Sequence, residues 1–253
     1  SLSHVEGGGT ALLMQDVTAA QAAEASRRQF SANVSHELRT PLTAISGYAE
    51  LLSSGMLQKP EDATEFGRKI LAESRRLLTL IEDIIRLSRL DEGVRGEVTP
   101  VDLTALIQHC VQKLTPAAQN AQVSISASGN DPVLISGDHA LLEEMLTNLL
   151  ENGIKYNHAG GYVRARAEMA DGHAVVTVAD NGVGIAPEDQ QRVFERFYRV
   201  DKSRSKQTGG TGLGLSIVKH GAQVHHAQIA MQSALGEGTT ITLTFPAQSS
   251  GKK

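Results

Sequence analysis

The 253-residue sequence predicts an antiparallel hairpin of two long helices, followed by an α/β sandwich with one mixed, mostly antiparallel sheet. Apolar residues recur every three or four positions over residues 19–54 and again over 60–91, which is the spacing of an amphipathic helix. After residue 100 helical and strand-like patterns are mixed, as in layered α/β domains. Residues 93–100, Gly-Val-Arg-Gly-Glu-Val-Thr-Pro, separate the two textures, so we expect a hinge there.

The first long helix is predicted from a nearly continuous apolar seam. Phe30, Val34, Leu38 and Leu42 recur every four residues, so we expect them to form a buried stripe. Pro41 lacks a backbone N–H and is expected to kink the helix. Ser-Ser-Gly at residues 53–55 ends it.

The second long helix is predicted to begin at Pro60, a favoured first helical residue, and to end near Asp91. Its stripe consists of Phe66, Ile70, Ser74, Leu77, Ile81, Ile84 and Leu87. Two long helices joined by a short connection form an antiparallel hairpin. A single hairpin leaves one apolar face uncovered, and pairing two of them in a four-helix bundle buries it. The sequence therefore predicts a homodimer.

The remaining elements are expected in mixed order over residues 101–247. We predict helices at 102–114 and 138–156, with further helices beginning near Pro187 and near Gly212. Strands are expected at 123–126, 133–135, 162–169, 174–179, 229–232 and 239–245. Residues 1–18, with one strand at 10–14, read as the tail of an upstream domain, and 248–253 as a disordered tail.

Composition excludes several classes of function. A net charge of −4 without basic runs gives no electrostatic case for binding nucleic acid. The single cysteine, Cys110, excludes an intrachain disulfide and a cysteine-based metal cluster, and it suits a reducing compartment. No apolar run approaches the roughly 18 residues of a membrane span. The sequence begins without Met, so we interpret it as part of a longer protein.

The most informative segment is Phe-Ser-Ala-Asn-Val-Ser-His-Glu-Leu-Arg-Thr-Pro-Leu at residues 30–42. His36 is two positions from Val34 and from Leu38, so it is expected to point away from the core. An exposed imidazole on a rigid helix, with the carboxylate of Glu37 beside it, is suited to act as a nucleophile. Taken alone, a solvated surface histidine is the better interpretation.

A second group of residues is suited to holding a nucleotide. Asn148 and Asn152 are four apart, and Lys155 follows three later, so all three share one helical face. Two amide oxygens and an ammonium on one surface are suited to Mg²⁺ and phosphates. An ordinary amphipathic helix explains the pattern equally well. Gly153 costs about 1 kcal/mol relative to Ala within a helix, which indicates close packing or a nearby ligand.

Two glycine-containing segments complete this group. Asp180-Asn-Gly-Val-Gly-Ile follows a predicted strand, where a carboxylate can accept from the exocyclic amine of adenine; a plain hairpin turn is the alternative. Gly-Gly-Thr-Gly-Leu-Gly at residues 209–214 lets backbone N–H groups approach phosphates at a helix N-terminus. It matches neither a Walker loop nor a dinucleotide loop.

Residues 200–208, rich in Lys, Arg, Ser and Gln, are expected to form a flexible lid over the nucleotide; a solvated loop is the alternative.

Five blocks in one order carry a resemblance. They are His-Glu-Leu-Arg-Thr-Pro, Asn-x-x-x-Asn-x-x-Lys-Tyr, Asp-Asn-Gly-Val-Gly, Phe-Glu-Arg-Phe-Tyr-Arg and Gly-Thr-Gly-Leu-Gly-Leu. Over residues 19–247 the chain resembles the sensor histidine kinases of two-component signalling, and within them the phosphate-responsive and cell-wall-sensing groups. Residues 12–18 are similar to the end of a PAS domain.

The resemblance implies a fold and a set of roles. Residues 19–92 would be the dimerisation and phosphotransfer domain, and 101–247 a Bergerat-type ATP-binding domain. His36 would be the phosphoacceptor and Glu37 the base toward its imidazole, while Thr40 would position water when the partner is dephosphorylated. Asn152 would bind Mg²⁺ with support from Asn148. The other nucleotide contacts implied are Lys155, Tyr156, Asp180, Gly182, Gly184, Arg199, Lys202, Gly210, Thr211, Gly212, Leu213 and Gly214.

The function implied is autophosphorylation of His36 by ATP with Mg²⁺, then transfer to an Asp of a response regulator receiver domain. A phosphatase-dominant form and a non-catalytic ATP-binding dimeric scaffold are the alternatives. The chain would be the cytoplasmic portion of a membrane-anchored bacterial sensor, with no membrane contact of its own. It departs from the family pattern at Gly153, where Ala is usual, and at His225-His226-Ala227, which replaces His-Gly-Gly.

Overall fold

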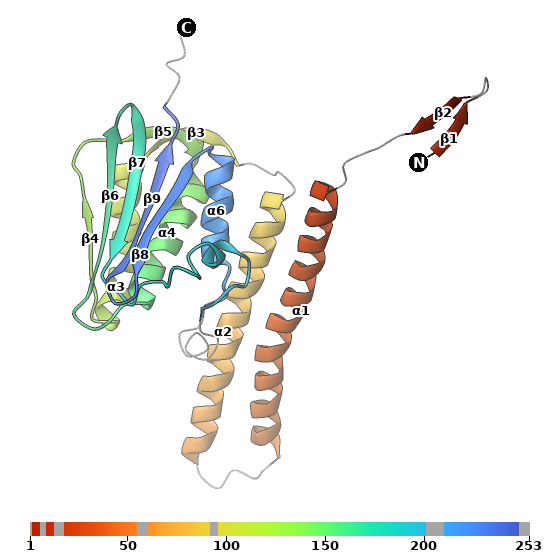
Figure 1. Ribbon diagram of the computed structural model, residues 1–253. Helices are drawn as coiled ribbons and strands as arrows, with labels where there is room; N and C mark the ends of the chain where they lie inside the picture. The colour runs from red at the N-terminus through yellow and green to blue at the C-terminus, as the bar shows by residue number, and fades with distance from the viewer. Residues whose placement is uncertain are drawn as a thin grey trace. The chain divides into compact units, whose positions relative to one another are not determined.

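A computed structural model describes residues 2–5, 9–12, 18–54, 60–91, 96–200 and 210–247 (Figure 1). The chain divides into two compact units, Ser1–Leu77 and Leu78–Lys253, which are described separately. The connection at 55–59, residues 93–95 of the expected hinge, residues 201–208 of the expected lid and the tail at 248–253 lie outside the described residues.

The first unit contains the helical hairpin as far as Leu77, and residues 78–91 of the second helix belong to the second unit. Strands β1 (Leu2–Val5) and β2 (Gly9–Leu12) pair in antiparallel fashion, and α1 (Thr18–Ser53) runs through Pro41 as one helix. Helix α2 (Pro60–Asp91) begins at the predicted proline. Tyr48 stacks on Phe66 with ring centroids 5.7 Å apart, and Glu37 lies 3.9 Å from Arg76. The earlier residue of α1 thus meets the later residue of α2, which confirms an antiparallel pair.

The predicted buried stripe of α1 is wrong at one position. Leu42 is 55% exposed, whereas its neighbour Pro41 is buried. Phe30, Val34 and Leu38 are half-buried. Leu71 and Leu51 are exposed as well, at 49% and 43%. A pair of helices has too little surface to cover both apolar faces, so part of the seam remains open in a single chain.

The second unit is an α/β sandwich built on a five-stranded sheet. The strand order is β4-β6-β7-β9-β8, with β4 parallel to β6 and every other pair antiparallel, which confirms the predicted mixed sheet. Its strands are β4 (Ser124–Ser128), β6 (Tyr162–Ala170), β7 (His173–Asp180), β8 (Gln228–Ala234) and β9 (Gly238–Phe245). Helices α3 (Leu103–Asn120), α4 (His139–Lys155) and α6 (Gly214–Val224) cover one face of this sheet (Figure 1).

The core lies between these helices and the sheet. Its members include Leu103, Ile107, Leu142, Leu150 and Val163, all at most 1% exposed. Asp102 caps α3 by accepting from the N–H groups of Thr104 and Ala105, and Asp138 caps α4 by accepting from that of Leu141. Helices α3 and α4 thus begin within one residue of the predicted caps.

Two boundaries differ from the predictions. The hinge does not extend to residue 100, because β3 (Val98–Asp102) pairs with β5 (Leu134–Asp138) in a separate two-stranded sheet. Helix α3 continues through Pro116 to Asn120, since Ala118 is buried in the core beyond the proline.

The helix expected near Pro187 is wrong. That segment forms turns and a short 3₁₀-helix, Arg192–Phe194. The side chain of Gln190 donates to the carbonyls of Ile185 and Ser233, at 3.1 and 2.8 Å, which ties the segment to β8.

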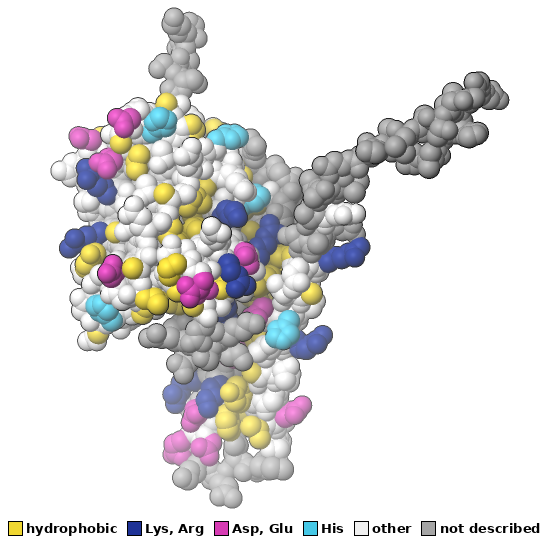
Figure 2. All heavy atoms as spheres, in the orientation of Figure 1, with side chains coloured by type: hydrophobic (Ala, Val, Ile, Leu, Met, Phe, Trp, Pro, Cys, Tyr) yellow, Lys and Arg dark blue, Asp and Glu magenta, His cyan; other side chains and the backbone are white. Residues whose placement is uncertain are grey.

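The described surface carries interspersed charges of both signs on the face drawn in Figure 2. Among the described helices, none combines the length and apolar character needed to span a bilayer.

Candidate active site

The imidazole of His36 projects into solvent from α1. Its side chain is 78% exposed, and its Nδ1 lies 3.9 Å from Oε1 of Glu37. Glu37 is 27% exposed, and its other carboxylate oxygen is 3.9 Å from the Arg76 guanidinium of α2. Arg76 thus biases the orientation of the Glu37 carboxylate from the neighbouring helix. The prediction that His36 points away from the core is confirmed.

Thr40 stands one helical turn after His36. Its Oγ1 donates a hydrogen bond of 3.2 Å to the His36 carbonyl, and the side chain is exposed. The hydroxyl is therefore on the same helical surface as the imidazole, because residues four apart are neighbours on a helix.

The predicted polar face of α4 meets the glycine-rich segment. Asn148 donates from Nδ2 to the Glu144 carbonyl at 3.0 Å, and a methyl group at Gly214 would overlap its Oδ1. A methyl group at Gly210 would overlap Nζ of Lys155. At these glycines the segment lies in close contact with the side chains of α4. Asn152 is half-buried, and its amide makes no hydrogen bond within the described part of the chain.

Asp180 ends β7 at the base of this region. Its Oδ1 accepts from the Gly182 N–H at 2.8 Å, and burial raises the pKa of the carboxyl, while backbone N–H bonds from Gly182 and Thr239 oppose the shift. The next strand along the chain, β8, pairs with β9 and not with β7, so the segment after Asp180 is not the hairpin turn of the alternative interpretation.

Tyr156 joins the same region from the end of α4. Its carbonyl accepts from the Val183 N–H at 3.0 Å, and a methyl group at Gly182 would overlap that carbonyl. The ring is 39% exposed, and Nζ of Lys155 lies 5.2 Å from its centroid.

Close packing accounts for Gly153. A methyl group there would lie 3.0 Å from both methyls of Val163 and 3.5 Å from Cβ of Asp180. Of the two explanations open from sequence, the structure supports contact with β6, directly behind Asp180.

The remaining residues predicted to contact the nucleotide differ in their burial and backbone conformation. Gly184 and Gly212 have φ of +68° and +74°, which glycine adopts readily. The Gly212 carbonyl accepts from the Phe197 N–H at 2.8 Å. Leu213 is fully buried, backbone included, so the structure gives no support to its predicted contact with a ligand. Arg199 is half-buried, and Lys202 lies outside the described residues.

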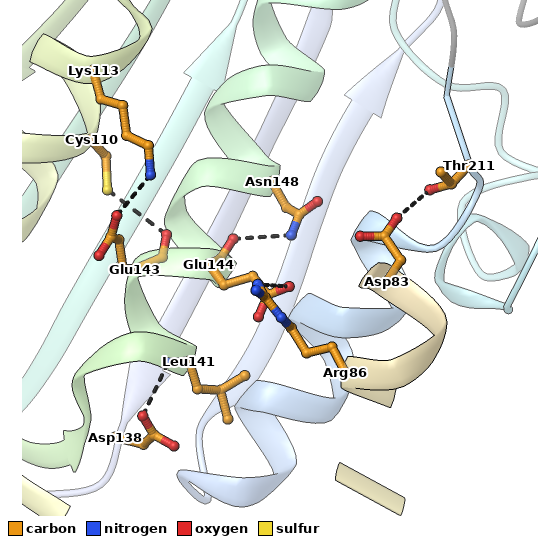
Figure 3. Close-up of polar contacts among 10 residues, drawn as sticks. All are labelled: Asp83, Arg86, Cys110, Lys113, Asp138, Leu141, Glu143, Glu144, Asn148 and Thr211. Atoms are coloured by element: carbon orange, nitrogen blue, oxygen red, sulfur yellow. Dashed lines mark hydrogen bonds and ion pairs between the residues drawn. The ribbon is translucent and has the colours of Figure 1, made fainter. Parts of the chain in front are cut away.

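Sequence reasoning missed three polar residues of this region. Asp83 of α2 accepts a hydrogen bond of 2.8 Å from the Thr211 hydroxyl, and Arg86 forms an ion pair with Glu144 of α4 (Figure 3). No sequence signal identifies them, because charged residues between apolar positions are ordinary on an amphipathic helix.

A separate pocket of about 350 Å³ lies at the opposite end of α4, lined in part by Asp138, His225 and His226. Both ring nitrogens of His225 are engaged: Nδ1 lies 2.8 Å from the Gly221 carbonyl, and Nε2 accepts from the Asp138 N–H at 3.0 Å. This imidazole therefore supports the fold. Within the described residues, no three His, Cys, Asp or Glu side chains are grouped to hold a metal.

Two family descriptions match consecutive parts of the chain. Residues 26–93 match the His Kinase A (phospho-acceptor) domain, and 137–249 match the histidine kinase-, DNA gyrase B-, and HSP90-like ATPase. The first range contains His36, and the second contains α4, Asp180 and the glycine-rich segment.

Named proteins are similar over most of the chain. Sensor-like histidine kinase SenX3 of Mycolicibacterium smegmatis is 43% identical over 88% of this chain and 58% of its own length. Phosphate regulon sensor protein PhoR of Pseudomonas aeruginosa is 39% identical over 94% of this chain and 54% of its own. The chain thus spans a little over half of these relatives. The crystal structure of full-length ShkA in complex with AMPPNP is 30% identical, with a TM-score of 0.62 over 85% of this chain and 45% of that one.

Proposed function

Because the chain belongs to the sensor histidine kinases, we propose that it phosphorylates His36 with ATP and passes the phosphoryl group to an aspartate of a response regulator. The observation that carries the proposal is the exposed imidazole of His36, with Nδ1 turned to Glu37 and Arg76 beyond it.

The chemistry follows from this geometry. With a proton on Nδ1 facing Glu37, the lone pair of Nε2 is free to attack the γ-phosphorus. The new N–P bond forms as the bond from phosphorus to the β,γ-bridging oxygen breaks, and ADP leaves with that electron pair. Glu37 accepts the Nδ1 proton, which prevents the ring from holding a full positive charge. Phosphoryl transfer depends mainly on such positioning and charge neutralisation.

The nucleotide would be held at the surface between α4 and the glycine-rich segment. Asp180 accepts from the adenine amine beside Tyr156, and Lys155 neutralises phosphate. The amide oxygens of Asn148 and Asn152 suit a hard cation, and a bound Mg²⁺ would supply charge neutralisation of the phosphates there. The amide of Asn152 makes no hydrogen bond to the residues that the structure describes, and Gly210 and Gly214 approach α4 closely; both observations support this fit. ShkA was solved with AMPPNP, an ATP analogue.

The test is incubation with γ-³²P-ATP. Wild type is expected to acquire an acid-labile, alkali-stable label, and His36→Gln to lose it completely while still binding nucleotide. His173→Gln, which removes an exposed imidazole at the start of β7, is the matched control and should label normally. Acid-labile label retained in His36→Gln would overturn the assignment of the phosphoacceptor.

A phosphatase activity toward the regulator is the second candidate, because the Thr40 hydroxyl is exposed one turn from His36. In this role Thr40 orients water for attack on the phospho-aspartate. Thr40→Ala should reduce hydrolysis of the phosphorylated regulator at least tenfold and leave labelling of His36 within about twofold. Equal losses of both activities would contradict a separate role for Thr40.

The assembly is a homodimer in this proposal. Leu42 on α1 and Leu78, Ile81 and Ile85 on α2 are 55%, 60%, 38% and 49% exposed, and a second copy of the hairpin would cover them. Leu78→Glu is expected to shift the mass measured by light scattering from dimer to monomer. The relatives are named as sensors, and we propose that this chain is the cytoplasmic portion of a membrane-anchored sensor. Fractionation of the full-length sensor tests the anchoring.

A further inference from the structure

The last turns of α2 pack against the nucleotide-binding unit. Leu87 is fully buried and Leu80 is 4% exposed. Leu90 packs on the core cluster formed by α3, α4 and the sheet. Residues 78–91 accordingly fall in the same compact unit as the α/β sandwich. In the structure this part of α2 is therefore docked on the α/β sandwich.

Two polar links accompany the apolar contact (Figure 3). The Thr211 hydroxyl donates to Oδ2 of Asp83 at 2.8 Å. The Arg86 guanidinium lies 2.5 Å from Oε1 of Glu144, whose side chain is only 9% exposed. The two links start from the same face of α2, and each reaches a different part of the sandwich: the glycine-rich segment and α4.

Each link attaches to one side of the proposed phosphate site. Thr211 stands between Gly210, which lies against Lys155, and Gly212. The carbonyl of Glu144 receives the amide of Asn148 at 3.0 Å, one turn along α4. Docked α2 therefore contacts both the glycine-rich segment and the helical face that together would hold the phosphates.

Helix α2 brings the Asp83 carboxylate to the Thr211 hydroxyl, while the positive charge of Arg86 on the same helix is engaged by Glu144. Asp83 is half-buried, and burial raises the pKa of its carboxyl despite the hydrogen bond from Thr211. Burial also raises the pKa of Glu144, and the nearby Asp83 charge adds to that shift while Arg86 opposes it. A polyphosphate brought to Thr211 would thus meet the negative charge of the Asp83 carboxylate.

We propose that the end of α2 is an internal competitor of the nucleotide: the Asp83 carboxylate holds the hydroxyl that a nucleotide phosphate would otherwise bind, so α2 docking and nucleotide binding oppose each other. The inference rests on the nucleotide site proposed above. Thermodynamic reciprocity then requires that a bound nucleotide weaken the docking of α2 by the same factor by which docking weakens the nucleotide.

The first test measures AMPPNP affinity by titration calorimetry on the whole chain with Mg²⁺. Asp83→Asn keeps the size of the side chain and removes its charge, and it is expected to bind AMPPNP about tenfold more tightly than wild type. Glu82→Gln removes the same charge from the exposed neighbouring position and should change the affinity less than twofold. An Asp83→Asn affinity equal to or weaker than wild type would overturn the inference. Failure of wild type and of Asp83→Asn to bind would instead refute the proposed function.

The second test needs no variant and so does not depend on folding of a mutant. Amide hydrogen exchange is followed in peptides from residues 78–91 of wild type, with and without saturating AMPPNP. Nucleotide should increase exchange there at least threefold, while peptides from α3, which do not contact α2 through these links, stay unchanged. Unchanged or slower exchange over 78–91 in a chain that binds AMPPNP would refute the competition.

Discussion

Gly67 and Gly184 are the same residue type in opposite surroundings. A methyl group at Gly67 of α2 would meet no heavy atom within 4 Å, whereas one at Gly184 would overlap the carbonyl oxygen of Ala234. The contrast extends to the two chemical centres. His36, Glu37 and Thr40 stand on one regular helix, where local sequence alone determines their exposure and spacing. Around Asp180 the functional groups come from segments far apart in the sequence. Backbone contacts too close to admit a larger side chain bring these segments together.

The largest effect expected from this contrast is at Gly184. Gly184→Ala should destabilise the second unit by about 3 kcal/mol, because the overlap with Ala234 adds to the cost of a left-handed backbone in alanine. Denaturant unfolding followed by circular dichroism measures the loss.

The matched control is Gly236→Ala, whose φ of +79° is similar but whose added methyl group meets nothing within 4 Å. It isolates the backbone cost, about 1 kcal/mol. Equal losses for the two variants would show that the close approach at Gly184 has no energetic weight.

In the hairpin, replacing glycine by alanine should increase stability instead of lowering it. Gly67→Ala and Gly47→Ala place alanine in helix interiors with nothing within 4 Å of the new methyl group. Each is expected to stabilise its helix by about 1 kcal/mol. Slower amide exchange in peptides from α1 and α2 measures the gain. A destabilised Gly67→Ala variant would contradict the open surroundings of that position.

The same contrast explains how far sequence reasoning reached. The hairpin, the exposure of His36 and the helical face of Asn148, Asn152 and Lys155 follow from periods of three and four residues, because such patterns are local. Long-range pairing is not local. The sequence predicts a hinge over the first three residues of β3, because this short strand pairs only with β5, more than thirty residues later.

The polar links of α2 cannot be predicted from the sequence, for the same reason. Asp83 and Arg86 look like any charged residues on an amphipathic helix, and their partners Thr211 and Glu144 are 128 and 58 positions away. Tertiary contact gives these side chains their role, and a single sequence carries no record of it.

A smaller effect is expected where the chain departs from His-Gly-Gly. His226 has a φ of +53°, a left-handed conformation that a non-glycine residue adopts at a cost. His226→Gly should stabilise the second unit by about 0.5 kcal/mol, part of the relief being offset by the greater freedom of glycine in the unfolded chain. His220→Gly, within α6, is the control and should destabilise by about 1 kcal/mol. Thermal unfolding compares the two, and a loss of stability in His226→Gly would show that the histidine side chain contributes more than its backbone strain.

The smallest effect is expected at Asp180, where a substitution should change how the free energy of unfolding varies with pH. Burial raises the pKa of this carboxyl in the folded chain. The stability that proton uptake contributes is therefore fully present below the unfolded pKa of about 3.9 and is lost as pH rises through the folded value. Asp180→Asn cannot ionise and escapes this loss. Its stability relative to wild type should improve as pH increases across that window, while Asp131→Asn, an exposed control, changes little.

Asp180→Asn is also expected to bind AMPPNP more weakly at neutral pH, because an ionised carboxylate accepts more strongly from the adenine amine than an amide does. Stability gained together with affinity lost would identify Asp180 as a carboxylate kept charged for its ligand, and a parallel loss of both would assign it to the fold alone.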